Sequence, residues 1–368
     1  MSDPRHTRLA HVLVDYSLDV QPGQVVAIVG TPLADPLIRS VYQRILERGA
    51  QPMVVLALPG LQEVFFRYAA EPILDRVNPL VKFVYENADG LIQILSSSHT
   101  RELAGSDPER VKRARASDAP VTKTFMERSS RNELHWVVTQ FPTDAQAQDA
   151  DMSPLTYQEF VYRACHVDGE DDPVAYWRQF KAKQQVICDW LKGKQVLRLR
   201  GPNVDLTLSI RDRIFINADG RNNMPDGEVF TGPVEDGVDG WVRFTYPAVY
   251  SGREVDGVEL HFEAGKVVKA SARKNEEFML SVLDTDAGSR TLGEFAIGTN
   301  YGVDRHTRNI LFDEKIGGTI HLALGAAYPE TGGRNESAVH WDIVCDMHAD
   351  SEIAADGEVF YRNGQFTI

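Results

Sequence analysis

The chain has 368 residues and a formal net charge of −14, with 39 lysine and arginine residues against 53 aspartate and glutamate residues. This acidic balance disfavours nucleic acid and anionic membranes as partners, because both present dense negative charge. No apolar run approaches the roughly 20 residues that cross a bilayer.

The cysteines and the N-terminal residues bear on localisation. Cys165, Cys188 and Cys345 are widely spaced and lack the paired spacing of metal ligands, so we expect reduced, mostly buried thiols. The first residues show no charged leader followed by an apolar stretch, so we expect no signal peptide. Both observations indicate a cytoplasmic protein.

Segments typical of strands and helices alternate in the first third of the chain. Residues 25–29 form an apolar, β-branched run, and residues 37–48 show helical spacing that ends at Gly49. We expect further strands, the first of them buried, at residues 53–58, 90–95 and 134–139. Strands that alternate with helices predict an α/β domain with a mainly parallel sheet.

The first strand invites comparison with a dinucleotide-binding turn, but the required glycines are absent. After Gly30 the chain continues Thr-Pro-Leu-Ala-Asp-Pro, so no second or third glycine brings the backbone up to a pyrophosphate. We therefore interpret this part of the chain as a scaffold domain that binds no cofactor.

The sequence pattern changes from helical to strand-like after a helical stretch at residues 151–193. Short alternating strands follow, and the dipeptides Asp256-Gly257 and Ala264-Gly265 have the chemistry of hairpin turns. We expect an N-terminal α/β domain at residues 1–193 that ends in this helical segment. A C-terminal α+β domain with mixed or antiparallel strands is expected at residues 194–368.

Two histidines of the C-terminal domain lie in segments typical of strands. His340 and Asp342 are two residues apart in Ala-Val-His-Trp-Asp-Ile-Val, so their side chains point to the same face of a strand. His321 lies in a similar segment, Thr-Ile-His-Leu-Ala-Leu. One histidine in a strand is more often a core residue than a ligand. Two such strands, one with an aspartate on the same face, indicate a metal site.

Two glutamates in unusual surroundings add to this set. Glu228 follows a Pro-Asp-Gly turn and precedes Val-Phe, and Glu294 stands among apolar residues in Leu-Gly-Glu-Phe-Ala-Ile. Either alone is more often an ordinary charged residue, but buried charges are normally paired or metal-bound. Three carboxylates and two imidazoles suit two divalent cations, zinc, cobalt or manganese rather than calcium.

Such a pair of cations would activate a water molecule and polarise a carbonyl group, which is hydrolytic chemistry. The cluster contains no cysteine, so it is not a structural zinc finger. The sequence also lacks a His-Glu-x-x-His helix and a Gly-x-Ser-x-Gly elbow, the commonest single-zinc and serine alternatives. The residues alone leave a second possibility open, because His321, His340 and Asp342 by themselves suit non-haem iron.

Six segments, spread over nearly the whole chain, carry a family resemblance: residues 16–26, 48–52, 223–231, 292–294, 311–325 and 335–342. The chain resembles the thermophilic-type metallo-aminopeptidases, the aminopeptidase T, aminopeptidase S and PepS group. The longest of these segments reads Leu-Phe-Asp-Glu-Lys-Ile-Gly-Gly-Thr-Ile-His-Leu-Ala-Leu-Gly.

The resemblance implies which residues form the active site. Five ligands would hold two divalent metal ions, zinc or cobalt first and manganese or magnesium as further candidates: Glu228, Glu294, His321, His340 and Asp342. We assign Glu294 as the bridging ligand. Tyr328 corresponds to the family's active-site tyrosine, whose hydroxyl would donate a hydrogen bond to the oxyanion of a tetrahedral intermediate. Glu314 is a candidate for orienting His321.

The resemblance further implies a metal-dependent aminopeptidase that hydrolyses the N-terminal bond of peptides with a free N-terminus. It implies a homodimer whose active sites face an enclosed internal cavity. Two rival functions remain. A ring-cleaving dioxygenase would use His321, His340 and Asp342, and leaves Glu228, Glu294 and Tyr328 without a role. A binding or scaffold protein without activity would not need the complete ligand set.

Overall fold

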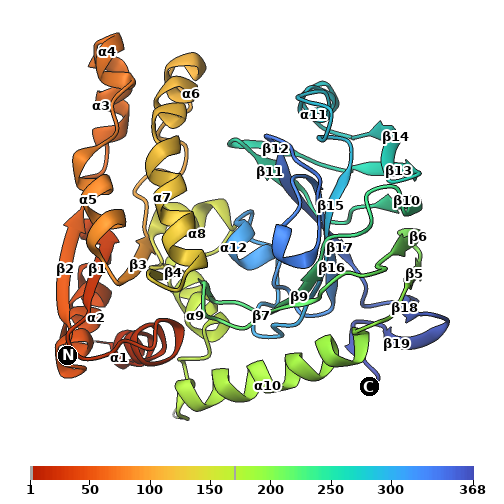
Figure 1. Cartoon of the computed structure of the whole chain (residues 1–368), viewed down its shortest axis with the longest axis horizontal. Helices are drawn as coiled ribbons and strands as arrows, with labels where there is room; N and C mark the ends of the chain where they lie inside the picture. Colours follow the sequence, from red (N-terminus) through yellow and green to blue (C-terminus); the bar gives the residue numbers. More distant parts are fainter. Residues whose placement is uncertain (1–2, 170) are drawn as a thin grey trace. The chain divides into compact units, whose positions relative to one another are not determined.

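A computed structural model describes residues 3–169 and 171–368, which divide into two compact units (Figure 1). The first unit contains the chain up to Arg178 together with Gly220–Met224. The second contains Gln179–Asp219 together with Pro225–Ile368. The division falls within one long helix, α10 (Pro173–Leu191).

The first unit is a parallel sheet covered by helices. Its helical elements are α1 (Pro4–His11), η1 (Val12–Ser17), η2 (Pro32–Ala34), α2 (Asp35–Glu47), α3 (Leu61–Tyr68), α4 (Glu71–Leu74), α5 (Pro79–Asn87), α6 (Pro108–Ser117), α7 (Ala119–Ser130), α8 (Asp144–Asp149) and α9 (Pro154–Ala164). Its strands, in sheet order, are β2 (Gln51–Leu56), β1 (Val25–Gly30), β3 (Gly90–Leu95), β4 (His135–Gln140) and β8 (Asn223–Met224). Every neighbouring pair is parallel, as predicted.

Both faces of this sheet are covered. Val84 of α5 and Phe125 of α7 belong to a cluster with Ala27 and Leu91, which point to one face of the sheet. Alternate residues of β1 are buried as well, and they point to the other face, on the side of α2. Burial on both faces explains why these strands are continuous apolar runs.

The strand β2 differs from its prediction in position and in burial. It spans 51–56 instead of 53–58, and its side chains are exposed or half-buried. The reason is that β2 lies at the edge of the sheet and pairs only with β1 among the described residues. Apolar composition alone does not distinguish an edge strand from a central one.

The second unit contains two main antiparallel sheets, a two-stranded antiparallel hairpin and few helices. The larger sheet has the order β14 (Lys266–Ser271), β13 (Glu259–Glu263), β10 (Val238–Arg243), β6 (Val204–Ser209), β5 (Val196–Gly201), β18 (Glu352–Ala355), β19 (Glu358–Arg362), β20 (Gln365–Phe366). The smaller sheet has the order β17 (His340–Asp346), β16 (Thr319–Gly325), β15 (Leu292–Gly298), β9 (Glu228–Thr231), β7 (Ile216–Ala218). The remaining elements are the hairpin β11 (Ala248–Tyr250) and β12 (Arg253–Val255), the helices α11 (Glu276–Leu283) and α12 (Ile310–Asp313), and η3 (Pro329–Thr331).

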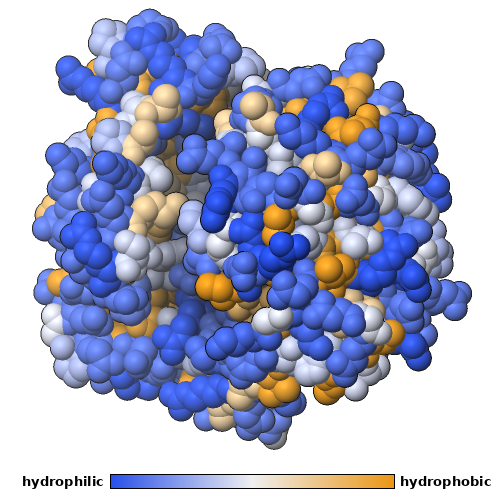
Figure 2. All heavy atoms as spheres, turned by 45° about the vertical axis from the view of Figure 1, so that its right-hand side comes forward, coloured by the Kyte–Doolittle hydropathy of each residue, from blue (hydrophilic) through white to orange (hydrophobic). Residues whose placement is uncertain are grey.

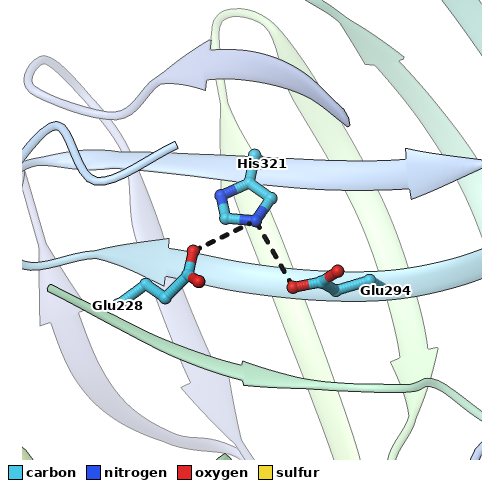
Figure 3. A group of neighbouring side chains, drawn as sticks. All are labelled: Glu228, Glu294 and His321. Atoms are coloured by element: carbon cyan, nitrogen blue, oxygen red, sulfur yellow. Dashed lines mark ion pairs between the residues drawn. The ribbon is translucent and has the colours of Figure 1, made fainter. Parts of the chain in front are cut away.

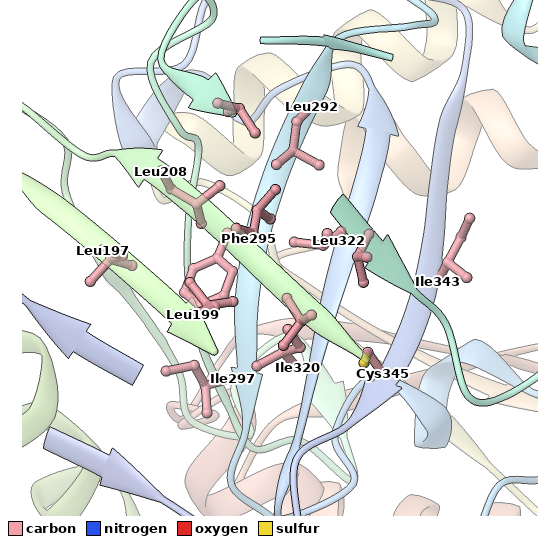
Figure 4. Close-up of a cluster of buried hydrophobic side chains, with 14 of the residues drawn as sticks. Leu197, Leu199, Leu208, Leu292, Phe295, Ile297, Ile320, Leu322, Ile343 and Cys345 are labelled. Carbon is pink, nitrogen blue, oxygen red and sulfur yellow. The ribbon is translucent and has the colours of Figure 1, made fainter. Parts of the chain in front are cut away.

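One hydrophobic core joins the two sheets of the second unit. Leu197 and Leu208 of the larger sheet meet Phe295, Leu322 and Ile343 of the smaller sheet (Figure 4). All five side chains are buried. The smaller sheet therefore has one face committed to the core, and its other face is available for a different purpose.

Of the two predicted hairpin turns, one is confirmed and one is wrong. Ala264 and Gly265 connect β13 to β14 with φ angles of 45° and 79°, and a Cβ on Gly265 would lie 1.6 Å from the carbonyl oxygen of Glu235. Asp256-Gly257 lies between β12 and β13, but β12 pairs with β11 and β13 belongs to the larger sheet. The turn therefore connects two different sheets.

The predicted fold class is confirmed, with a mainly parallel α/β unit followed by an α+β unit with antiparallel strands. Within the described residues, every helix is too short or too polar to span a bilayer. Hydrophilic residues form most of the face drawn in Figure 2, and hydrophobic residues lie there in small scattered groups.

Candidate metal centre

The five donor residues predicted from the sequence lie on four neighbouring strands of the smaller sheet. Glu228 begins β9, Glu294 lies in β15, His321 in β16, and His340 and Asp342 in β17. The register pairs Gly298 with Glu228, Ala296 with His321, and Ala323 with both Glu294 and Asp342. Paired residues share a face of the sheet, so all five donors project from the face opposite the core.

A β-bulge at Gly293 decides the direction of Glu294. The register shifts between Leu292 and Glu294, so these residues, although two apart, point to opposite faces. A Cβ on Gly293 would lie 2.4 Å from the carbonyl oxygen of Gly325 and 2.5 Å from that of Ala326. The bulge therefore depends on glycine, and it turns Glu294 away from the core.

Small residues lie between the donors. Ala296 and Ala323 are fully buried at the centre of this face. A Cβ on Gly298 would lie 2.1 Å from the carbonyl oxygen of Ile316, and Gly325, opposite His340, has a φ of 101°. These four residues form a floor that leaves the long donor side chains free to converge above it.

The donor side chains converge on Glu294. Figure 3 shows His321 facing Glu228 and Glu294, with its Nε2 atom 3.3 Å from Oε2 of Glu228 and 3.5 Å from Oε1 of Glu294. The other oxygen of Glu294 lies 3.3 Å from Nε2 of His340. Asp342 has the same relation to the histidines, with Oδ1 4.0 Å from His321 and Oδ2 3.6 Å from His340.

These atoms form two groups of possible metal ligands. Glu228, Glu294 and His321 make one group, and Glu294, His340 and Asp342 make the other. Glu294 is common to both. Among the described residues, no group of three close donor atoms contains both histidines. The arrangement fits two neighbouring ions better than a single ion held by His321, His340 and Asp342.

Local contacts orient individual donors. The Nδ1 atom of His340 lies 2.9 Å from the carbonyl oxygen of Ala326, which can only accept, so Nδ1 carries the proton and Nε2 is free to bind a metal. Oε2 of Glu228 and Oδ1 of Asp342 are buried and have no hydrogen-bond partner within the part of the chain that the structure describes. A buried carboxylate oxygen without a hydrogen bond lowers the stability of the fold, and a bound cation would offset this loss.

The charges of the five donors are strongly coupled. Burial opposes the protonation of both imidazoles, but the surrounding carboxylates outweigh it and raise the pKa of His321 to about 9 and that of His340 to about 10. Burial raises the pKa values of Glu228 and Asp342, whereas the two histidines outweigh burial and lower the pKa of Glu294. The cluster therefore holds protons that a bound metal ion has to displace.

Sequence patterns did not identify Lys315, which is fully buried beside Glu228. Its Nζ atom lies 2.9 Å from Oε1 of Glu228 and 3.7 Å from Oδ1 of Asp226, and it also contacts Oε1 of Glu314. These carboxylates outweigh burial and hold the pKa of Lys315 well above its usual value. The only sequence signal is a lysine placed between a glutamate and an Ile-Gly-Gly segment, and lysine is ordinarily expected at the surface.

Tyr328 and Glu314 lie in the loops around the donor face. Tyr328 precedes η3, and its ring centroid is 5.1 Å from that of His340 and 5.4 Å from that of Phe230. Glu314 caps α12, and it forms a third group of close donor atoms with His321 and Asp342. The structure therefore brings all seven predicted site residues into one region of the second unit.

A family model for the thermophilic metalloproteases (M29) matches residues 2–366. Because this match spans nearly the whole chain, the chain belongs to the thermophilic metalloprotease (M29) family. Aminopeptidase 2 of Geobacillus stearothermophilus is 30% identical, with 98% of this chain and 97% of that protein covered. The predicted enzyme class, a metallo-aminopeptidase that acts on peptide bonds, is confirmed.

Two solved structures share the fold. Wild-type AmpT from Thermus thermophilus has a TM-score of 0.86 at 24% identity, with 99% of each chain covered. The 2,5-dihydroxypyridine dioxygenase from Pseudomonas putida KT2440 has a TM-score of 0.62 at 14% identity, with 100% of this chain and 98% of that chain covered. At these identities the likeness concerns the fold alone, so the dioxygenase function is not favoured by it.

Proposed function

We propose that the chain is an aminopeptidase that acts through two divalent cations held by Glu228, Glu294, His321, His340 and Asp342. The observation that carries this proposal is the position of Glu294, which presents one carboxylate oxygen to each histidine. A carboxylate in that position is suited to bridge two ions, and the remaining donors divide evenly between them.

The donor set fits this metal pair. Glu228 and Asp342 each have a buried oxygen without a hydrogen bond in the described structure, and both histidines turn Nε2 toward the carboxylates. Imidazole nitrogen combined with carboxylate oxygen favours zinc or cobalt, with manganese or magnesium as further candidates. Lys315 fixes the second oxygen of Glu228, so that Oε2 is the atom left for a metal.

When bound, the two cations lower the pKa of a water molecule and polarise the scissile carbonyl group. The residues of the chain position the groups that react. Tyr328 stands beside His340 at the outer edge of the cluster, where its hydroxyl can donate to the developing oxyanion. Loss of surrounding water, followed by the charges of Glu294 and Asp342, raises the pKa of Tyr328, so its hydroxyl keeps its proton at neutral pH.

We further propose that the substrates are peptides with a free N-terminus in the cytoplasm. Reduced cysteines fit that compartment, because all three cysteines are free and buried.

The proposed homodimer is supported by exposed hydrophobic side chains of the first unit. Between residues 54 and 83, ten large hydrophobic side chains are 38–74% exposed: Val54, Leu56, Leu58, Leu61, Val64, Phe65, Tyr68, Ile73, Leu80 and Phe83. Val54 and Leu56 lie on β2, whose outer edge is unpaired within the described residues and can pair with the same edge of a second copy.

Light scattering tests this interface. We expect a dimer for the wild-type chain and a monomer when Val54 and Leu56 are both replaced by lysine. The control is Val268→Lys, because Val268 is also exposed, at 53%, but lies on β14 of the second unit. A dimer that survives the double substitution would place the interface elsewhere.

Metal analysis combined with peptide hydrolysis tests the proposed function. We expect two zinc or cobalt ions per chain, release of N-terminal residues from leucine or phenylalanine amides, and complete loss of activity after chelation. Acetylation of the substrate's N-terminus should abolish cleavage. Activity that persists after exhaustive removal of metal, or oxygen consumption with a dihydroxypyridine and ferrous iron, contradicts the proposal.

A further inference from the structure

Glu314 is a carboxylate at the centre that the five ligands do not include. One of its oxygen atoms lies within 4.8 Å of donor atoms of both His321 and Asp342. It does not come from the sheet, because it follows α12 in the loop between β15 and β16. Glu314 therefore reaches the donor cluster from a loop, whereas all five proposed ligands reach it from the floor of the sheet.

The carboxylate of Glu314 is held in place before any substrate binds. Its Oε1 atom contacts Lys315, and the backbone on either side is fixed by bonds from Lys315 N to the carbonyl oxygen of Phe312 and from Asn300 N to that of Lys315. Lys315 is fully buried, so its side chain cannot move between the many conformations open to a lysine on the surface. One oxygen of Glu314 is thus occupied, and the other remains for a further partner.

Accessibility separates Glu314 from the other carboxylates around Lys315 and His321. Its side chain is 16% exposed, compared with 11% for Asp342, 8% for Glu228, 4% for Glu294 and 3% for Asp226. Among these residues, Glu314 is the most exposed carboxylate. The more deeply buried carboxylates are occupied with Lys315 or with the histidines.

We propose that Glu314 binds the α-ammonium group of the substrate's N-terminal residue. This inference rests on the proposed aminopeptidase function, because an enzyme that cleaves only the first peptide bond must recognise a free amine beside the metal centre. A cation enters a partly buried site when an anion is already placed to receive it. Lys315 acts as a positioning residue, since it fixes one oxygen of Glu314 and directs the other toward the substrate.

An ammonium-binding role for Glu314 differs from the role of a sixth metal ligand. Replacing a metal ligand would lower the number of bound metal ions. An ammonium-binding residue leaves both ions in place and changes only the preference for molecules that carry an amine. Its position favours the second role, because Glu314 comes from a loop and lies outside the two ligand groups that share Glu294.

Binding of a matched pair of ligands tests this assignment without relying on turnover. Leucine and 4-methylpentanoate differ only in the α-amino group, and their affinities for the zinc-loaded full chain can be measured by calorimetry. We expect the wild-type chain to prefer leucine by about tenfold or more, the usual effect of one hydrogen bond between charged groups. In Glu314→Gln this preference should fall to about twofold or less, with the number of bound zinc ions unchanged.

Two further variants separate the possible causes of such a change. Glu330→Gln removes the same charge from an exposed residue two positions after Tyr328, and it should keep the wild-type preference. Glu314→Asp keeps the charge and should retain part of the preference, and Glu314→Ala replaces Glu314→Gln if that variant does not fold.

A Glu314→Gln variant that still prefers leucine overturns the inference, and so does one that loses a zinc ion. Failure of the proposed function would appear separately, as a wild-type chain that binds fewer than two ions or does not hydrolyse peptides.

Discussion

The two faces of the sheet β17-β16-β15-β9-β7 carry opposite chemistry on the same strands. One face contributes Phe295, Leu322 and Ile343 to the hydrophobic core, and the other presents the five proposed metal ligands. Neighbouring residues such as Glu294 and Phe295 therefore belong to different environments. The comparison shows how a well-packed core can hold a costly cluster of charges in place, because each strand serves both faces.

The largest effect is expected when the donor face loses the residue common to both ligand groups. Glu294→Ala should lower kcat/KM for an amino-acid amide by more than about a thousandfold and reduce the bound metal to one equivalent or less. Elemental analysis and initial rates measure both. Glu330→Ala removes an exposed carboxylate instead and should change neither quantity. Full activity in Glu294→Ala would remove this residue from the centre.

The neighbouring residue tests the other face. Phe295→Ala empties a fully buried position and should lower the free energy of unfolding by about 3–5 kcal/mol. Denaturant titration of the metal-free chain measures this loss. Val268→Ala, at an exposed position of β14, should stay within about 0.5 kcal/mol of the wild type. Equal losses of unfolding free energy in Phe295→Ala and Val268→Ala would mean that the core does not depend on this face of the sheet.

The bulge connects the two faces, so Gly293→Ala should disturb both of them. The new Cβ meets two carbonyl oxygens, and we expect a loss of about 1–3 kcal/mol in unfolding free energy together with weaker metal binding. Gly105→Ala is a matched control, because a Cβ there meets nothing within 4 Å. Unchanged metal affinity in Gly293→Ala would show that the bulge does not direct Glu294.

The smallest effect is a pH dependence restricted to the donor face. The raised pKa values of His321 and His340, about 9 and about 10, mean that both imidazoles are protonated at neutral pH without metal. Metal binding must release these protons, so affinity rises as the pH increases toward these values, by up to about tenfold per pH unit for each proton. Zinc titrations in two buffers of different ionisation heat count the protons released, and no release contradicts the coupling.

The sequence predicted the strands of the donor face well, because alternation in a strand is a local property. The spacing of His340 and Asp342 placed both on one face, and His321 lay in an equally clear strand. The side of Glu294 was not predictable in this way, since regular alternation from Leu292 would turn it into the core. Only the register with the neighbouring strand reveals the bulge.

Long-range contacts account for what the sequence did not show. Lys315 is a typical surface residue by composition, and its burial depends on carboxylates up to 89 positions away in Asp226 and 87 in Glu228. The edge position of β2 likewise depends on strand order, which local patterns do not contain. The proposed ligand set gained Glu228 and Glu294 mainly from the family resemblance.

The floor of Ala296, Gly298, Ala323 and Gly325 has a consequence for how this scaffold changes its chemistry over evolutionary time. These residues determine how much room remains above the sheet, and none of them is a donor. We expect one larger side chain at Ala296 to fill the space between Glu228 and His321 while His340 and Asp342 stay untouched. A single substitution in this floor would therefore change the room for a cation without changing any of the donors.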